Sequence, residues 1–274
     1  MMTEGSTADF AELQEQARQI RRLVIDMIYN AGSGHCGGSL SCVEILTTLY
    51  NSVLRIRPHE PHWPQRDRFI LSKGHAAPAL YAVLAKSGFF PLDDLSTLRK
   101  IHSNLQGHPD MTKTPGIEMS SGSLGMGISA GIGMVWTARL KKEYWRTFVL
   151  IGDGELDEGQ NWEAAMLAHK LRLDGLYVII DRNHVQLDGK TKDIMPLGNV
   201  EGKFKAFGWN TSNCDGHDCN SIGNAIDNAI KQSGPSVIIA ETIKGKGVDF
   251  MEGDHNWHGA VMSEEQYQQA VSML

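Results

Sequence analysis

Hydrophobic residues recur along the chain with two different periods. Near the N-terminus they lie three or four residues apart, which predicts an amphipathic helix over about residues 8–30, and a second helix is predicted over 43–54. Further along, apolar residues form short continuous runs with β-branched side chains, at residues 147–151 and 176–180. Such runs are typical of strands that are covered on both faces.

Strand-like and helix-like stretches alternate in the second half of the chain. The two apolar runs are separated by NWEAAMLAHKLRL, which is rich in helix-forming residues, so these segments predict a right-handed βαβ unit. The pattern predicts an α/β fold with a doubly wound, mostly parallel sheet and helices on both faces. We expect a single domain over residues 1–274. The other predicted elements are a strand at 68–72, a strand at 208–214, a helix around 218–232 and a strand at 235–243.

Composition excludes several classes of function. With 41% hydrophobic and 21% charged residues among 274, the chain can bury a sizeable core. A formal charge of −6 gives no general attraction to nucleic acid or to an anionic membrane, and no apolar stretch approaches 18 residues. Neither a secretory signal nor a CxxC pair is present, so we expect a cytoplasmic protein whose cysteines are reduced.

Two polar segments follow neighbouring predicted strands. Asp153, between two glycines, comes directly after the run at 147–151, and Asn183 follows Gly154 after 28 intervening residues. The βαβ unit brings both to the carboxyl edge of the sheet, where ligands bind in such folds. Carboxylate, amide and main-chain oxygens suit Mg²⁺, and the glycines would let the backbone approach a diphosphate. GDG alone is also a common turn, but strand–GDG–helix–strand–Asn is far more restrictive.

This arrangement resembles the diphosphate-binding motif of thiamine diphosphate enzymes. Further segments in family order resemble the N-terminal, diphosphate-binding domain of transketolases over roughly residues 15–260. They are GSGHCGGSLS, DRFILSKGHAAPALYAVLA, QGHPD, SSGSLGMGISAGIGM, CDGHD and WHG.

The resemblance implies a cofactor site of thiamine diphosphate and Mg²⁺, which Ca²⁺ or Mn²⁺ could replace. Asp153, the Asn183 side chain and the main-chain oxygen of Val185 would bind the metal. Residues implied to contact the cofactor are Gly122, Ser123, Leu124, Gly154, Glu155, Asn183, His75 and His258. Glu158 would join a hydrogen-bond network between two active sites, although an acidic residue in the first turn of a helix explains it equally well.

Four histidines fall on active-site positions of the family. His35, His75, His108 and His258 would act in catalysis, with His35, His108 and His258 meeting hydroxyl and carbonyl oxygens of the substrate. Imidazole suits this task because it can donate, accept or move a proton near neutral pH. For Lys244 and Lys246, binding of a phosphate and a solvated loop position are equally good interpretations.

The family's pyrimidine-binding domain has no counterpart in these residues. We therefore expect the N-terminal subunit of a split transketolase, paired with a C-terminal subunit in an α2β2 assembly. It would move a two-carbon ketol unit from a ketose phosphate or analogue to an aldose. The alternatives are a subunit resembling 1-deoxyxylulose-5-phosphate synthase or a 2-oxo acid dehydrogenase, and a non-catalytic subunit that binds cofactor for assembly. A dinucleotide-binding module is disfavoured because no GxGxxG motif opens the first βα unit.

Three residues depart from the usual family pattern near the expected substrate channel. Cys36 and Ser123 stand where proline is common, and Met126 stands where glutamine is frequent. The sequence after WHG differs as well. Because of these changes, the family resemblance does not identify the sugar substrate.

Overall fold

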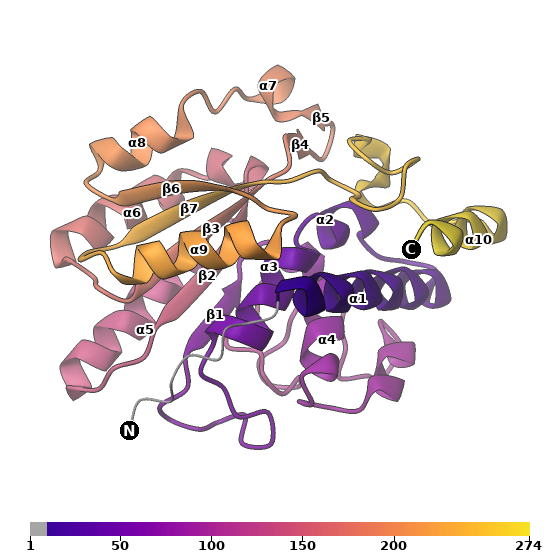
Figure 1. The fold of residues 1–274 in the computed structure, drawn as a ribbon, viewed down its shortest axis with the longest axis horizontal. Helices are drawn as coiled ribbons and strands as arrows, with labels where there is room; N and C mark the ends of the chain where they lie inside the picture. Colours follow the sequence, from indigo (N-terminus) through magenta and orange to yellow (C-terminus); the bar gives the residue numbers. More distant parts are fainter. Residues whose placement is uncertain (1–9) are drawn as a thin grey trace.

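The computed structural model describes residues 10–274, and its first element is the predicted N-terminal helix (Figure 1). This helix, α1, runs over Phe10–Ala31, and the first two residues of its predicted range lie outside the described part. The second predicted helix is divided into α3 (Val43–Thr48) and a π-helical turn, η1 (Leu49–Val53).

A five-stranded parallel sheet forms the centre of the fold. Its strands lie in the order β1-β2-β3-β7-β6, and every neighbouring pair is parallel. The strands are β1 (Arg68–Leu71), β2 (Thr147–Gly152), β3 (Leu176–Arg182), β6 (Asn210–Asp215) and β7 (Ser236–Glu241). The predicted mostly parallel α/β fold is confirmed.

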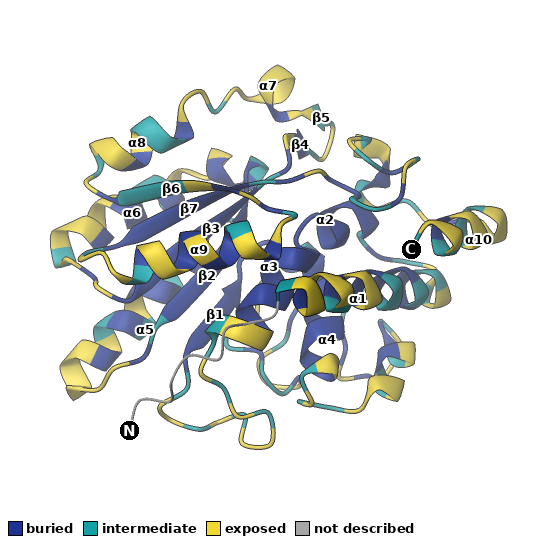
Figure 2. Cartoon of the chain, viewed as in Figure 1, coloured by how far each residue is buried: buried dark blue, intermediate teal, exposed yellow. Residues whose placement is uncertain are grey.

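Side chains of the central strands alternate between two hydrophobic clusters, one on each face of the sheet. Along β3, Tyr177 and Ile179 belong to one cluster, whereas Val178 and Ile180 belong to the other. Because both faces are covered, β2, β3 and β7 are buried except for the last residue of β3 and of β7 (Figure 2). This is the physical reason for the continuous apolar runs in the sequence.

Helices from different parts of the chain cover the two faces. The first cluster includes residues of α1, α3, α4 (Ala77–Lys86) and α9 (Cys219–Ile230). The second includes residues of α5 (Gly127–Lys141), α6 (Gly159–Leu171) and α8 (Val200–Ala206). The C-terminal helix α10 (Glu264–Met273) packs on α1, where Tyr267 stacks on Tyr29 with ring centroids 4.0 Å apart.

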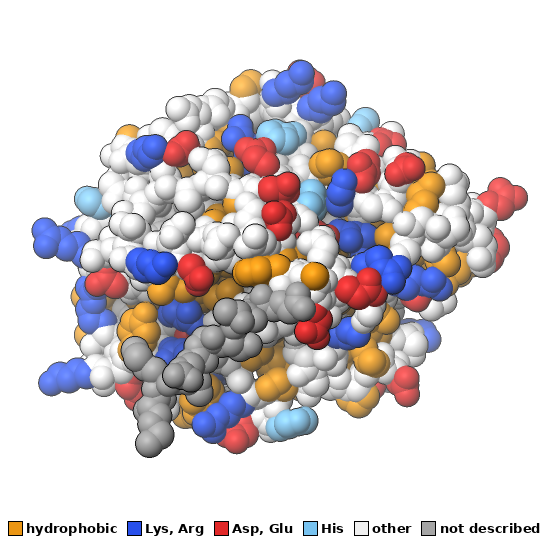
Figure 3. All heavy atoms as spheres, viewed as in Figure 1, with side chains coloured by type: hydrophobic (Ala, Val, Ile, Leu, Met, Phe, Trp, Pro, Cys, Tyr) orange, Lys and Arg blue, Asp and Glu red, His pale blue; other side chains and the backbone are white. Residues whose placement is uncertain are grey.

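Short elements surround the carboxyl edge of the sheet. They are α2 (Cys36–Leu40), α7 (Thr191–Ile194), the hairpin of β4 (Val185–Gln186) and β5 (Gly189–Lys190), and the 3₁₀ turns η2 (Gly74–Ala76), η4 (Gly154–Asp157) and η5 (His255–His258). A further 3₁₀ turn, η3 (Leu92–Thr97), packs against α1 and α4 instead. In the described chain no helix is both long and apolar enough to cross a membrane. Acidic and basic side chains are interspersed on the face drawn in Figure 3. Cys36, Cys42, Cys214 and Cys219 are buried free thiols.

Candidate active site

A cavity of about 220 Å³ lies at the carboxyl ends of β2 and β3. Its lining comes from separate segments that the sheet brings together, including the turn after β2, the hairpin after β3, helix α2 at Gly38 and the segments around residues 73 and 244. The lining includes the following residues named from the sequence: His75, Leu124, Asp153, Gly154, Glu155, Asn183, Val185 and His258. The predicted edge of the sheet therefore holds the predicted group of residues.

The carboxylate of Asp153 is buried and held by main-chain amides. One oxygen accepts from Gly154 N at 2.9 Å and the other from His184 N at 2.7 Å, and the residue is 2% exposed. Burial and the neighbouring Asp181 carboxylate raise the pKa of Asp153 to about 6. Burial thus outweighs the hydrogen bonds from the main chain of His184 and Gly154, which by themselves would lower this pKa.

The donor atoms around Asp153 fit a hard cation better than a softer metal. Asn183, one residue beyond β3, is buried, and its side-chain oxygen accepts from Val185 N at 3.1 Å. In the described residues no group of three or more His, Cys, Asp or Glu side chains could hold a metal. A metal here would therefore take one carboxylate together with amide and main-chain oxygens, the set that suits Mg²⁺ with added water or phosphate.

The sequence did not distinguish the roles of Lys244 and Lys246, but the structure places these two lysines in different environments. Lys244 is 2% exposed, and its Nζ lies 3.0 Å from His258 Nδ1 and 3.4 Å from the Val185 main-chain oxygen. Burial, together with the nearby Lys73 ammonium, lowers the pKa of Lys244 to about 8. Lys246 is partly exposed and pairs with Glu252 at 3.3 Å. Only the first of these two lysines lines the cavity.

Sequence reasoning missed a buried ion pair between Asp181 and Lys73, which lines the cavity. Lys73 Nζ contacts the Asp181 carboxylate and donates to Gly38 O at 2.9 Å. Burial alone would raise the pKa of Asp181, but the Lys73 ammonium and hydrogen bonds from Lys73, Ser41 and Thr242 hold it below its ordinary value. The sequence does contain one sign of this ion pair. Asp181 is a charged residue that directly follows the apolar run at 176–180.

The four predicted histidines form one cluster. The ring centroid of His35 lies 5.3 Å from that of His258, 5.6 Å from His75 and 6.0 Å from His108. Burial lowers the pKa of both His35 and His258 to about 4, and that of His75 well below its ordinary value. These rings are therefore neutral at pH 7 and able to donate and accept hydrogen bonds.

Glycines allow this close approach. A Cβ on Gly38 would lie 2.8 Å from the His75 ring, and one on Gly37 would lie 3.0 Å from Lys244 Cγ. The two glycines lie in α2, in the segment that the sequence suggested to be a glycine-rich loop, and they let two site side chains pack against the helix backbone.

The remaining predicted residues differ in how they meet the cavity. Leu124 lines it, whereas Gly122 and Ser123 lie outside its lining, and a Cβ on Gly122 would be 3.3 Å from the His108 ring. The Glu155 carboxylate accepts from Ser72 Oγ, from Gly125 N at 2.8 Å and from Gly152 N at 3.1 Å.

Glu155 therefore joins the loop before α5 to the end of β2. Glu158 is exposed at the start of α6, and its side chain makes no capping hydrogen bond.

Comparison with known proteins adds independent evidence. Residues 13–274 match the family of the transketolase, thiamine diphosphate binding domain. The chain is 47% identical to the 6-deoxy-6-sulfo-D-fructose transketolase subunit SqwG of Clostridium sp. (strain MSTE9), covering 96% of both chains. It is 41% identical to one subunit of the apulose-4-phosphate transketolase of Phocaeicola vulgatus, covering 94% of this chain and 92% of that one.

Solved structures show the same relationship. The crystal structure of transketolase from Campylobacter jejuni superposes with a TM-score of 0.90 at 36% identity, over 95% of this chain and 42% of that one. The chain thus spans about two-fifths of the solved transketolases that it matches. On its motifs, its fold and its relatives, the chain belongs to the transketolase family, in which it corresponds to the thiamine diphosphate-binding domain.

Proposed function

We propose that this chain is the thiamine diphosphate-binding subunit of a two-chain transketolase that transfers a two-carbon ketol unit from an anionic ketose to an aldose. The observation that supports this most is the arrangement of one cavity. A metal-type oxygen set, a buried lysine and four neutral histidines line or adjoin it. When bound, the cofactor supplies the carbon nucleophile and the electron sink for breaking the carbon–carbon bond.

The inner end of the cavity would hold the diphosphate and its cation. Asp153, Asn183 and the main-chain oxygen of Val185 would bind Mg²⁺, or Ca²⁺ or Mn²⁺ in its place. Lys244, whose ammonium is 3.4 Å from that oxygen, would pair with the diphosphate. The backbone at Gly154 can come close to the phosphates because that position has no side chain.

The histidines would position the sugar. His75 and His258 lie at the inner side and would contact the cofactor, whereas His35, His108 and His258 would meet the substrate's hydroxyl and carbonyl oxygens. As neutral rings, they can donate to a carbonyl oxygen or accept from a hydroxyl without placing a net charge beside the reacting carbons. The protein thus holds these proton donors and acceptors at fixed positions, which adds to the chemistry that the cofactor supplies.

A second chain would complete the active site. Relatives of similar length are named as transketolase subunits, and the human transketolase, of which this chain covers 42%, is a longer protein. We propose an α2β2 assembly in the cytoplasm, in which the exposed Glu158 faces another protomer.

Two relatives are named for anionic sugars, 6-deoxy-6-sulfo-D-fructose and apulose 4-phosphate. We therefore expect a ketose that carries a phosphate or a sulfonate. Cys36 is a core residue of α2, so its departure from the family pattern does not place a different side chain in the cavity. Ser123 and Met126 are exposed and flank Leu124, which lines the cavity, so they remain candidates for specificity.

Reconstitution tests this proposal. The chain should transfer ketol units only when it is mixed with its C-terminal partner, thiamine diphosphate and Mg²⁺. Ketol transfer by the chain without a partner would contradict the two-chain assignment. Release of CO₂ from a 2-oxo acid, without ketol transfer, would instead favour the enzymes that resemble 1-deoxyxylulose-5-phosphate synthase or a 2-oxo acid dehydrogenase. A non-catalytic assembly role is excluded if His258→Ala abolishes transfer by the pair while cofactor binding is kept.

A further inference from the structure

The histidine of the CDGHD segment lies outside the active-site cavity. His217 is in the turn between β6 and α9, and it is not part of the cavity lining. Its main chain is fixed on both sides, since His217 N donates to Asp215 Oδ1 at 2.8 Å and His217 O accepts from Gln14 Nε2 at 3.1 Å. These bonds hold the backbone from which the imidazole ring projects.

Both ring nitrogens of His217 have a partner. Nε2 lies 2.8 Å from the main-chain nitrogen of Ile243, which can only donate, so Nε2 accepts. The proton of the neutral imidazole is then on Nδ1, which donates to Glu44 Oε2 at 3.1 Å. One neutral ring thus joins α3 to the segment that follows β7.

Glu44 is held in turn by α1. It is 1% exposed, and its Oε1 accepts from Arg21 Nη2 at 2.6 Å. Burial alone would raise the pKa of Glu44, but the hydrogen bond from His217 and the charge of Arg21 hold it below its ordinary value. Glu44 is therefore a charged acceptor, which favours the tautomer of His217 that leaves Nε2 free to accept.

The segment bound by Nε2 carries Lys244 into the cavity. Ile243 directly precedes this lysine, whose side chain lines the cavity. On the other side of the lysine, Gly245 N donates to Gly37 O at 3.0 Å. That acceptor belongs to the main chain, so any side chain at its position would supply it. The acceptor for Ile243 N, in contrast, depends on the single side chain of His217.

We infer that His217 is a positioning residue for Lys244, because its ring fixes the main chain from which the lysine enters the cavity. The lysine has little room to compensate for a shift of its backbone, since a Cβ on Gly37 would be only 3.0 Å from Lys244 Cγ. His217 therefore acts on the cofactor site without touching it. This inference rests on the proposed function, because it takes Lys244 as the group that pairs with the diphosphate.

Two substitutions separate the two contacts of the His217 ring. Glutamine can place its amide oxygen near the position of Nε2 and keep an acceptor for Ile243, whereas the shorter asparagine can keep only the donor to Glu44. In the assembled two-chain enzyme, we expect His217→Asn to raise the Kd of thiamine diphosphate about 5- to 10-fold, as for one lost hydrogen bond, and His217→Gln to stay within about twofold. At saturating cofactor, kcat should stay within about twofold in both. The reverse order of affinities, equal losses or no loss would overturn the inference.

A double-mutant cycle tests whether His217 acts through the lysine. In a Lys244→Met background the diphosphate has no ammonium to meet, so adding His217→Asn should change the Kd of thiamine diphosphate by less than about twofold. Losses that simply add would refute positioning through Lys244. Failure of the unaltered pair of chains to bind thiamine diphosphate would instead count against the proposed function, so the two failures are distinguishable.

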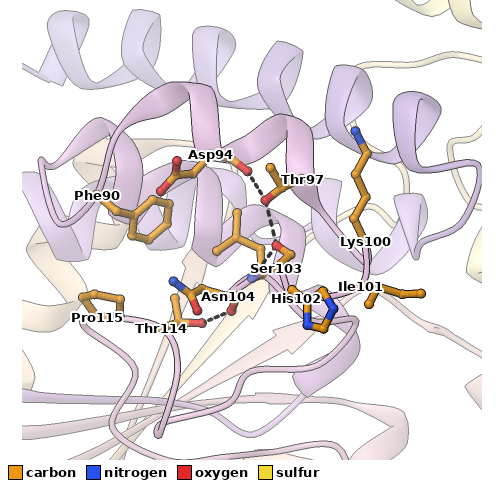
Figure 4. Close-up of a pocket in the computed structure, with 11 residues that line it drawn as sticks. Phe90, Asp94, Thr97, Lys100, Ile101, His102, Ser103, Asn104, Thr114 and Pro115 are labelled. Atoms are coloured by element: carbon orange, nitrogen blue, oxygen red, sulfur yellow. Dashed lines mark hydrogen bonds between the residues drawn. The ribbon is translucent and has the colours of Figure 1, made fainter.

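His102→Asn is the matched control. His102 is exposed and lines a separate cavity of about 380 Å³ (Figure 4). Its φ of 68° lies in the left-handed region, which asparagine tolerates better than most residues. The substitution should leave the cofactor affinity within about twofold. A loss as large as that of His217→Asn would show that the effect is not specific to the contact with Ile243.

A spectroscopic test needs no substituted protein. In the full, isotopically labelled chain, NMR of the His217 ring should show its proton on Nδ1. Nε2 should also show a scalar coupling to the amide nitrogen of Ile243 across the hydrogen bond. A proton on Nε2, or the absence of this coupling, would overturn the inference.

Discussion

Lys244 Nζ lies 3.0 Å from Nδ1 of His258, on one wall of the cavity at the carboxyl edge of the sheet. An ammonium can only donate, so Nδ1 accepts and the neutral imidazole carries its proton on Nε2. Burial and then the Lys244 charge lower the pKa of His258 to about 4, which keeps the ring in this form near pH 7. The pair thus fixes both a cation and the tautomer of a histidine on this wall of the cavity.

Replacing this lysine should weaken cofactor binding without weakening the fold. For Lys244→Met we expect the thiamine diphosphate affinity to fall about 10- to 100-fold, because a charge-assisted contact to the diphosphate is lost. Methionine fills a similar volume and leaves no ammonium to desolvate, so the melting temperature should stay the same or rise. Calorimetric titration with the partner present, together with thermal unfolding, measures both effects.

Lys246→Met is the control, since this side chain pairs with Glu252 at the surface of the loop. It should leave the cofactor affinity within about twofold. Similar losses for both lysines would show that the loop acts by its overall charge and not by the placement of Lys244.

Removal of the Asp153 charge should abolish the metal dependence of cofactor binding. Asp153→Ala removes the carboxylate and leaves the amides of Gly154 and His184 without their acceptor, which also costs stability. We therefore add Asp153→Asn, which keeps an oxygen acceptor but loses the charge that a divalent cation needs. In both variants, added Mg²⁺ should no longer raise the affinity for thiamine diphosphate.

Asp157→Asn, at an exposed position four residues later, controls for the general loss of negative charge and should keep the response to Mg²⁺. An unchanged response in Asp153→Asn would refute the metal assignment.

The sheet, and the position of Asp153 and Asn183 at the same edge of it, could be predicted from the sequence. Both depend only on the pattern of apolar and polar residues within short segments. Strands covered on two faces require continuous apolar runs, and a crossover returns the chain to the same edge. The strand predicted at 208–214 begins instead at Asn210, since Trp209 donates to Ala165 O and packs in the second cluster.

The environments of individual charged side chains could not be predicted in this way. Lys244 and Lys246 are two residues apart in the same glycine-rich loop, and no local pattern separates them. Their difference arises because the backbone of Gly37, more than 200 residues earlier, makes room for only one of them.

The histidine cluster should make the fold less stable in acid. His35 has a pKa of about 4 in the folded chain, below its ordinary value of 6.5, because burial and then the positive charge of Arg99 disfavour the imidazolium. The unfolded chain therefore binds more protons between these values, so stability is fully present above about pH 6.5 and is lost as pH falls toward 4.

Urea denaturation at several pH values should show this slope, and His35→Gln should make it shallower. An NMR titration of His35 with a midpoint near the ordinary value of 6.5 would contradict the prediction.

Glu155 and Glu158 offer a last comparison, since both were expected at the site but only one is buried. The Glu155 carboxylate accepts from Gly125 N and Gly152 N, so Glu155→Gln would turn an amide nitrogen toward one of these donors. We expect about 1–3 kcal/mol less free energy of unfolding, the usual effect of leaving a buried group without a partner. The cofactor affinity should fall as well, since the loop of Leu124 loses its attachment to β2.

Glu158→Gln should leave the stability of the separate chain unchanged, because this side chain is exposed and makes no capping hydrogen bond. If Glu158 lies between protomers, the same substitution should instead weaken the α2β2 assembly, which sedimentation analysis of the two-chain enzyme measures. A loss of stability in the separate chain, or unchanged assembly, would favour a simpler role for Glu158 as the residue that precedes the N-terminus of α6.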